Sequence, residues 1–243
     1  MTGKSRKLVN CVAIMQPTYL PWLGYFDLIA KSDLFVFLDS VQFDRRSWQQ
    51  RNKIKTRTGE MTLTVPIKSK GKRDQLISQT EIDYSQQYPR NHLGSIRSNY
   101  SKSKNFDHLF PTLCCEYEKK QRLLADLNIN LINAMAENIG INFECIRSSQ
   151  IPHSGRKSGV LVSICQYLGA SEYLAPIGSR QYIEREGLFR ESNIAVTYQE
   201  FPHPIYQQLL GSFISHLSVI DFLMNEGSDA LKTLRVNTDT EAG

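Results

Sequence analysis

The sequence predicts an α/β protein with a Rossmann-like, mostly parallel sheet and a helical insertion in the middle of the chain. Two observations predict it. Short apolar runs alternate with amphipathic stretches, which is typical of parallel strands covered by helices. Between about residues 85 and 140 this alternation stops, and Leu and Ile recur every three or four positions, as in helices. We expect a single α/β domain over residues 1–236 and a disordered polar tail at 237–243.

The beginning of the chain predicts a strand–helix–strand unit. The apolar run 11–14 is typical of a buried strand, and Pro17 and Pro21 set a turn after it. Helical spacing follows at 22–30, and a second apolar strand at 34–38. The elements expected after this unit are, in chain order, a strand at 61–67, a short strand at 77–82, a helix at 88–100, one or two helices over 106–139, a strand at 142–146, a helix at 158–168, a strand at 172–176, a helix at 182–191, a strand at 194–201 and a helix at 218–225.

Composition limits the class of protein. The 243 residues carry a formal charge of +5 and are 41% hydrophobic, which is enough for a core. No long uncharged apolar run predicts a membrane span, and no signal-peptide core follows the basic first residues. Five cysteines without metal-ligand spacing indicate reduced thiols, a cytoplasmic location and no metal site.

Basic residues are concentrated in one segment. From Asp44 to Arg73 there are ten Lys or Arg against two acids. Such an excess of positive charge attracts anions: phosphates, nucleotides, nucleic acid or acidic lipid. The charge alone does not indicate which of these anions is bound.

Polar side chains follow the first two predicted strands, where open parallel sheets bind ligands. Gln16 and Gln42 carry amides suited to sugar hydroxyls or a base edge, or to loop backbone. Asp39 is a candidate catalytic base, or an acceptor for a sugar hydroxyl or ammonium group; the alternative is a turn or cap residue. Tyr19, Trp22 and Tyr25 predict an aromatic wall for a base or sugar, although packing also explains them.

The most anion-like cluster is Arg46, Arg51 and Lys53 with Trp48 and Asn52. Forked guanidinium groups match phosphate oxygens, and Trp48 could stack on a base. This cluster would suit the diphosphate of a nucleotide sugar; the alternative is a solvated basic loop.

Histidines offer two further candidates. His92 is the second candidate acid or base, with backbone bonding as the alternative explanation, and His203, after the last strand, is a reserve candidate. No cysteine has an activating partner in the sequence.

These segments resemble the WbqC-like family. Its hallmark Q-P-x-Y-L-P-W-x-G-Y-F matches 16–26, its V-F-L-D-x-V-Q-F strand matches 36–43, and its basic R-x-W-x-x-R-N-x-I-K segment matches 46–55. Later markers such as His92 with Tyr100, Tyr206 and 217–221 extend the match to about residues 10–227. We count Tyr206 among the substrate-binding candidates. Many members begin the motif with His, where this chain has Met15.

The resemblance implies a bacterial protein of O-antigen or other surface-polysaccharide biosynthesis, which acylates or aminoacylates a nucleotide-linked amino sugar. A weaker, architectural resemblance is to nucleotidyltransferases of the pantothenate-synthetase type. Those use an H-x-G-H pair to bind triphosphate. The corresponding turn here holds Tyr19, Pro21, Trp22 and Gly24 without histidine, so adenylylation would have been lost.

Three functional hypotheses follow. In the first, an N-acyl or aminoacyl transferase, the basic cluster binds the diphosphate, Gln16 and Asp39 bind the sugar, and Asp39 or His92 deprotonates the amine. The amine attacks a carrier-protein or coenzyme A thioester, and no other cofactor is evident. In the second, the nucleotidyltransferase-like fold only binds a nucleotide, a glycan or a partner enzyme, which Met15 favours. The third, nucleic-acid binding, is disfavoured by the modest charge and the lack of a recognised motif.

Overall fold

The computed structural model describes residues 9–227 and 230. Contacts divide the chain into two compact units, each made of three segments. The unit called here the sheet unit comprises Met1–Met15, Asp27–Leu38 and Phe143–Glu200, and the helical unit comprises Gln16–Phe26, Asp39–Asn142 and Phe201–Gly243. That the chain is one domain stays a prediction, and the predicted tail at 237–243 lies outside the described residues.

None of the helices in the described part of the chain is both long enough and apolar enough to cross a membrane.

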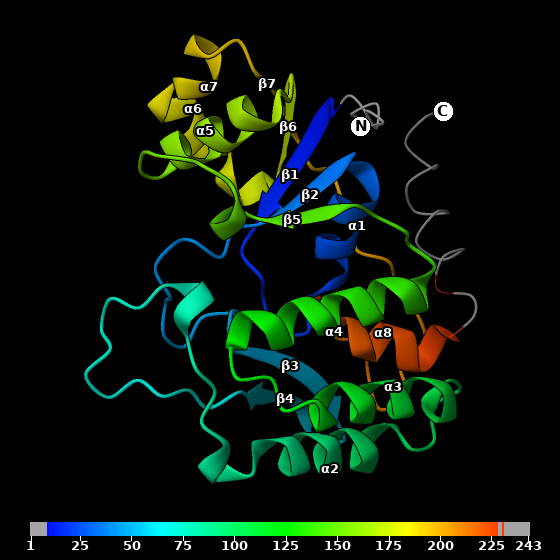
Figure 1. Cartoon of the computed structure of the whole chain (residues 1–243). Helices are drawn as coiled ribbons and strands as arrows, with labels where there is room; N and C mark the ends of the chain where they lie inside the picture. Colours follow the sequence, from blue (N-terminus) through cyan, green and yellow to red (C-terminus); the bar gives the residue numbers. More distant parts are fainter. Residues whose placement is uncertain (1–8, 228–229, 231–243) are drawn as a thin grey trace, which may run out of the picture. The chain divides into compact units, whose positions relative to one another are not determined.

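The sheet unit contains a five-stranded, all-parallel sheet (Figure 1). Its strands are β1 (Cys11–Met15), β2 (Leu34–Phe37), β5 (Cys145–Arg147), β6 (Glu172–Ala175) and β7 (Ala195–Tyr198). They lie in the order β5-β2-β1-β6-β7. Numbered within the sheet this is 3-2-1-4-5, the Rossmann order, with the direction of winding reversing between β1 and β6. The predicted fold class is confirmed.

Apolar side chains hold the sheet unit together. Its helices are α5 (Ser158–Leu168), α6 (Arg180–Glu186), α7 (Leu188–Glu191) and the part of α1 (Leu23–Lys31) that begins at Asp27, with 3-10 turns η3 (Ser148–Gln150) and η4 (Ile177–Ser179). Val12 and Ile14 pack in one core with Ile164 of α5, and the rings of Tyr173 and Phe189 stack 5.0 Å apart. Buried apolar strands of this kind are typical of parallel sheets.

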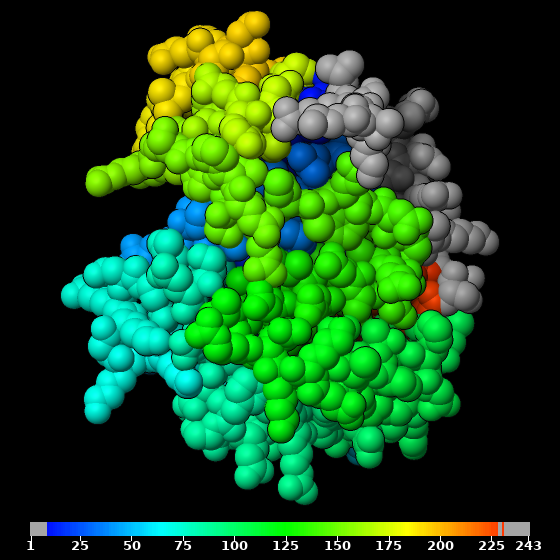
Figure 2. All heavy atoms as spheres, viewed as in Figure 1, coloured from blue at the N-terminus to red at the C-terminus, as the bar shows by residue number. Residues whose placement is uncertain are grey.

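The helical unit combines helices with a separate hairpin. Its helices are α2 (Tyr88–Tyr100), α3 (Phe106–Glu118), α4 (Leu124–Ile139) and α8 (Val219–Glu226), with η1 (Ile77–Gln79) and η2 (Tyr84–Gln86). Strands β3 (Arg51–Thr56) and β4 (Gly59–Thr64) pair antiparallel. Figure 2 shows the blue-green and green helical segments over much of the surface of this unit.

Three sequence predictions are wrong in detail. The predicted strand at 77–82 is mostly the 3-10 turn η1, and only Glu81 and Ile82 form isolated bridges. No strand is predicted at 51–56, but these residues form strand β3, in which Lys55 is buried, so the alternative of a solvated basic loop does not hold for this part of the segment. The helix at 182–191 is divided into α6 and α7 by Gly187, whose φ of 68° is a left-handed conformation that ends a helix.

Candidate functional site

All the residues predicted to bind substrate or act in catalysis lie in the helical unit. Gln16, directly after β1, is half-buried, and its Oε1 accepts a hydrogen bond from Gln49 Nε2 at 2.8 Å. Gln49 Oε1 in turn accepts from the backbone N–H of Asp44 at 3.1 Å. Gln49 therefore connects Gln16 to the loop at 44–50. Among the described residues the amide NH₂ of Gln16 has no partner, and it remains available as a donor.

Asn128 of α4 joins the segment that follows Gln16 to the loop at 44–50. Its Nδ2 donates to the backbone carbonyls of Pro17, at 2.9 Å, and Gln49, at 2.7 Å. Its side chain is fully buried, and its Oδ1 has no partner in the part of the chain that the structure describes. Because buried polar groups are expensive to leave unpaired, the two bonds to distant backbone show that the position of Gln16 is strongly specified.

The loop at 44–50 presents two side chains outward. Trp48 is 54% exposed, while its carbonyl accepts a hydrogen bond from Tyr19 N–H at 2.9 Å. Arg46 is exposed with φ of 61°, and its guanidinium has no ion pair among the described residues. The left-handed conformation costs a non-glycine residue on the order of 1–2 kcal/mol. Strained positions of this kind occur preferentially at functional sites.

The other members of the predicted anion cluster differ in availability. Arg51 is half-buried and has no ion pair within the described residues. Lys53 is paired with Glu60 on the other strand of the hairpin. Asn52 donates to the carbonyls of Tyr19 and Leu20, at 3.2 and 2.7 Å. Arg46 and Arg51 are therefore the members free to bind an anion, whereas Asn52 shapes the turn.

The two catalytic candidates are buried. Asp39 is fully buried just after β2, and its backbone carbonyl accepts from Ser78 N–H at 2.9 Å. His92 is 6% exposed, and its Nδ1 hydrogen-bonds the hydroxyl of Tyr19 at 2.8 Å. Burial lowers the pKa of His92 to about 4, although a backbone hydrogen bond at Thr64 opposes the shift. The imidazole is therefore neutral near pH 7. Both catalytic roles stay predictions.

The Tyr19 hydroxyl also hydrogen-bonds that of Tyr117 in α3. Tyr19 is fully buried, and burial raises its pKa well above the ordinary value. Tyr25 is nearly fully buried and donates its hydroxyl proton to the Gln16 carbonyl at 3.0 Å. Gln42, by contrast, is exposed and donates to Asp74 Oδ1 at 3.3 Å. Of the predicted aromatic wall, Tyr19 and Tyr25 belong to the interior.

Trp22 belongs to a cluster of rings instead. Its indole lies parallel to His203, 6.2 Å away at 7°, and 5.0 Å from His216. His203 Nε2 accepts from His216 N–H at 3.1 Å, and Nδ1 lies 2.9 Å from the Pro204 carbonyl, so His203 is the neutral tautomer protonated on Nδ1. A Cβ on Gly24 would lie 2.2 Å from the indole. This close approach explains the glycine in the W-x-G part of the opening motif.

A buried charged network was not predicted. Lys55 Nζ donates to Gln208 Oε1 at 2.7 Å, and Gln208 Nε2 donates to Asp221 Oδ2 at 2.8 Å. Tyr100 and Tyr206 also donate to the two oxygens of Asp221, at 2.7 and 2.8 Å. Burial raises the pKa of Asp221 and lowers that of Lys55, and hydrogen bonds or opposite charge oppose both shifts. Tyr206, a substrate-binding candidate, thus has a hydrogen-bond partner inside the protein.

Two signals could have revealed this network. The first is that Tyr100, Tyr206 and Asp221 lie in segments that match the family motifs. The second is that Lys55 ends the matching basic segment, although the alternation of β3 places it on the same side as Arg51 and Lys53 and does not by itself predict its burial.

The structure gives little support for a metal site or a reactive cysteine. In the described ranges no three His, Cys, Asp or Glu side chains gather as metal ligands. All five cysteines are free, and burial raises the pKa of Cys11 to about 11 and of Cys165 to about 12, so these thiols stay protonated near pH 7.

Together, the strand order and the polar residues after β1 define an α/β protein of the Rossmann-like class with a largely helical second unit. The chain belongs to the WbqC-like protein family, which it matches over residues 16–233. It is 36% identical over 226 residues to "Uncharacterized protein Rv1507c" of Mycobacterium tuberculosis, an alignment covering 92% of this chain and 97% of the relative. No solved structure matches the chain.

Proposed function

We propose that this protein is an N-acyl or aminoacyl transferase that modifies a nucleotide-linked amino sugar during bacterial surface-polysaccharide (O-antigen) biosynthesis. One observation carries the proposal: Gln49 ties the half-buried Gln16 to a loop that presents Trp48 and Arg46 outward. A fixed amide donor, an exposed aromatic ring and an unpaired guanidinium are the groups needed for a sugar hydroxyl, a base and a phosphate.

Each part of the substrate has a candidate partner. The Trp48 indole stacks on the base, and the guanidinium groups of Arg46 and Arg51 bind the diphosphate. The free NH₂ of Gln16 donates to a sugar hydroxyl. A guanidinium group binds two phosphate oxygens at once, which an ammonium group does not, and Lys53 is already paired with Glu60. Arg46 is therefore expected to contribute more to phosphate binding than Lys53.

The transfer itself forms one C–N bond and breaks one C–S bond. The sugar amine attacks the thioester carbonyl carbon, the carrier thiolate leaves, and the base takes the proton released by the amine. Asp39 or His92 is the base in this proposal. Burial keeps His92 neutral near pH 7, but by lowering its pKa to about 4 it also makes the imidazole a weaker base than a free histidine. Since both side chains are buried, substrate binding must displace residues that cover them.

Binding is tested first by thermal unfolding with UDP- and dTDP-linked amino sugars. A ligand at 100 times its dissociation constant adds about 2.7 kcal/mol to the free energy of unfolding. We expect Arg46→Gln to abolish this shift. The matched control is Arg57→Gln, an exposed arginine in the turn between β3 and β4, which should retain it. Equal shifts in both variants, or none in the wild type, would exclude this site.

Turnover is tested next, by release of free thiol from an acyl thioester in the presence of the amino sugar. Asp39→Asn and His92→Gln should each be assayed. A residue whose variant keeps full turnover is not the base.

A second candidate function is a module that binds a nucleotide, glycan or partner enzyme without catalysis. The burial of both Asp39 and His92, and Met15 at the position where many family members have His, favour it. Binding of the nucleotide sugar without turnover by any acyl thioester would select this alternative.

A further inference from the structure

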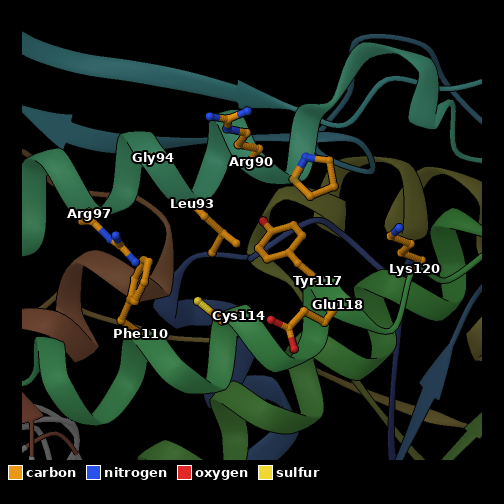
Figure 3. Close-up of a pocket in the computed structure, with 10 residues that line it drawn as sticks. Arg90, Leu93, Gly94, Arg97, Phe110, Cys114, Tyr117, Glu118 and Lys120 are labelled. Carbon is orange, nitrogen blue, oxygen red and sulfur yellow. The ribbon is translucent and has the colours of Figure 1, made fainter.

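Helices α2 and α3 of the helical unit enclose a groove of about 500 Å³ (Figure 3). Leu93, Phe110 and Tyr117 supply apolar surface, and Cys114 lies among them. Pockets of roughly 300–1,000 Å³ with predominantly apolar walls are typical of small-molecule sites. This groove contains none of the residues assigned above to nucleotide or sugar binding.

Gly94 in the middle of α2 widens the groove. A glycine inside a helix costs about 1 kcal/mol relative to alanine. A Cβ at this position would meet no atom within 4 Å, so no neighbouring group requires a glycine here. The missing side chain leaves open space along the groove wall. Gly94 therefore also offers a way to fill the groove without a clash.

The rim of the groove is basic. Arg90, Arg97 and Lys120 are exposed at its edge, against one acid, Glu118. No ion pair neutralises these three cations within the described residues. The Arg97 guanidinium lies 5.0 Å from the centre of the Phe110 ring, so a positive charge directly borders the apolar surface. This arrangement suits a ligand that joins an apolar chain to an anionic group.

The groove also touches the buried tyrosines of the opening motif. The Tyr117 ring lines it, and the Tyr117 hydroxyl hydrogen-bonds that of Tyr19, which in turn hydrogen-bonds His92. An occupant would therefore pack against a side chain that belongs to the same hydrogen-bonded chain as a catalytic candidate.

We infer that the α2–α3 groove binds the acyl donor: an apolar acyl chain lies on Leu93, Phe110 and Tyr117, and the anionic phosphate-bearing carrier group lies against Arg90, Arg97 and Lys120. The assignment as donor rests on the proposed function, whereas binding in the groove can be measured by itself. The apolar chain and the charged head of the ligand make separable contributions to the binding free energy, because salt screens only the contribution of the charged head.

The experiment is a calorimetric titration of the full-length protein with decanoyl-coenzyme A. We expect Gly94→Phe, which fills the groove, to weaken binding at least tenfold. Gly94→Ala should bind within about twofold of the wild type and unfold at a higher temperature, because alanine favours the helix. Arg90→Gln should weaken binding severalfold and reduce its dependence on salt. Coenzyme A without the acyl chain should bind at least tenfold more weakly.

The location is checked by alkylation of cysteines in a Cys115→Ser background. Decanoyl-coenzyme A should slow modification of Cys114, in the groove, relative to Cys145, an exposed cysteine of the sheet unit. Unchanged affinity in Gly94→Phe, unprotected Cys114, or equal binding of coenzyme A alone would each overturn the inference. If the acyl thioester binds as expected but no nucleotide-linked sugar shifts thermal stability, the inference that the groove binds an acyl thioester is supported and the proposed transferase function is contradicted.

Discussion

The sheet unit and the helical unit are stabilised in different ways. The centre of the sheet unit is apolar: Val12, Ala13 and Phe35 are fully buried in adjacent parallel strands. The helical unit has an apolar core of its own, but in addition it buries an ionisable network around Lys55 and Asp221, and amide side chains that bond to backbone far away in sequence. The difference teaches that irregular segments, which cannot pair their own backbone, need polar side chains to fix them.

The largest expected effect comes from removing the charge of Lys55 from the buried polar network of the helical unit. Lys55→Met removes the ammonium group from Gln208 and from the Ser212 carbonyl, and leaves Asp221 without a nearby positive charge. We expect a loss of about 3–5 kcal/mol in the free energy of unfolding, measured in urea. The control is Lys53→Met on the same strand, whose partly exposed pair with Glu60 should contribute less than about 1 kcal/mol. Equal losses would refute the central role of the network.

The apolar side is tested by Ile164→Ala in α5. Ile164 is fully buried in the core of the sheet unit, so the cavity should cost about 2–4 kcal/mol. Ile205, which is 82% exposed in the helical unit, supplies the control, and Ile205→Ala should change stability by less than about 0.5 kcal/mol. Urea midpoints give both values, and a cost for Ile164→Ala as small as the control would argue against this core.

A third prediction concerns acid stability. Burial lowers the pKa of His92 to about 4 from an ordinary value near 6.5, so the unfolded state binds more protons between these values. The contribution of His92 is complete above pH 6.5 and is lost as the pH falls toward 4, by up to about 3 kcal/mol. His92→Gln should flatten this slope, whereas His108→Gln, at an exposed histidine, should follow the wild type. Parallel slopes for both variants would remove His92 as the cause.

The smallest expected effect concerns Gly24. Its added methyl group in Gly24→Ala would lie against the Trp22 indole and displace it from His203 and His216. We expect a cost of about 1–2 kcal/mol and a changed fluorescence of Trp22, recorded in a Trp48→Phe background. Gly94→Ala, where a Cβ meets open space, is the matched glycine control. An unaltered spectrum would show that the indole tolerates the methyl group.

Strands β1, β2 and β6 could be predicted because each is a short apolar run bounded by turns, whereas β5 (Cys145–Arg147) begins three residues later than the strand predicted at 142–146 and has no fully buried residue. Strand β3 escaped prediction because its sequence is basic. Lys55 is buried even though it lies on the same side of the strand as the half-buried Arg51 and Lys53, so alternation gave no sign of its burial. Gln16 could be predicted from its place after β1. Its partner Gln49 could not, because the bond joins residues 33 positions apart, and the bond from Asn128 to Gln49 spans 79. No local pattern reports such pairings.

The same reasoning applies to the groove. Gly94 and Arg97 belong to a predicted helix, but only the packing of α2 beside α3 makes them two walls of one site.

The strand order has a consequence for the kinetics of folding. Strand β1 pairs on one side with β2, where Val12 faces Leu34, and on the other with β6, where Cys11 faces Glu172. The first pairing closes a short loop, while the second must wait until most of the chain has been synthesised. Long-range parallel pairing slows folding and leaves edges exposed meanwhile. During translation the β1–β2 pair would present an open edge, so this protein is expected to depend on chaperones more than its size suggests.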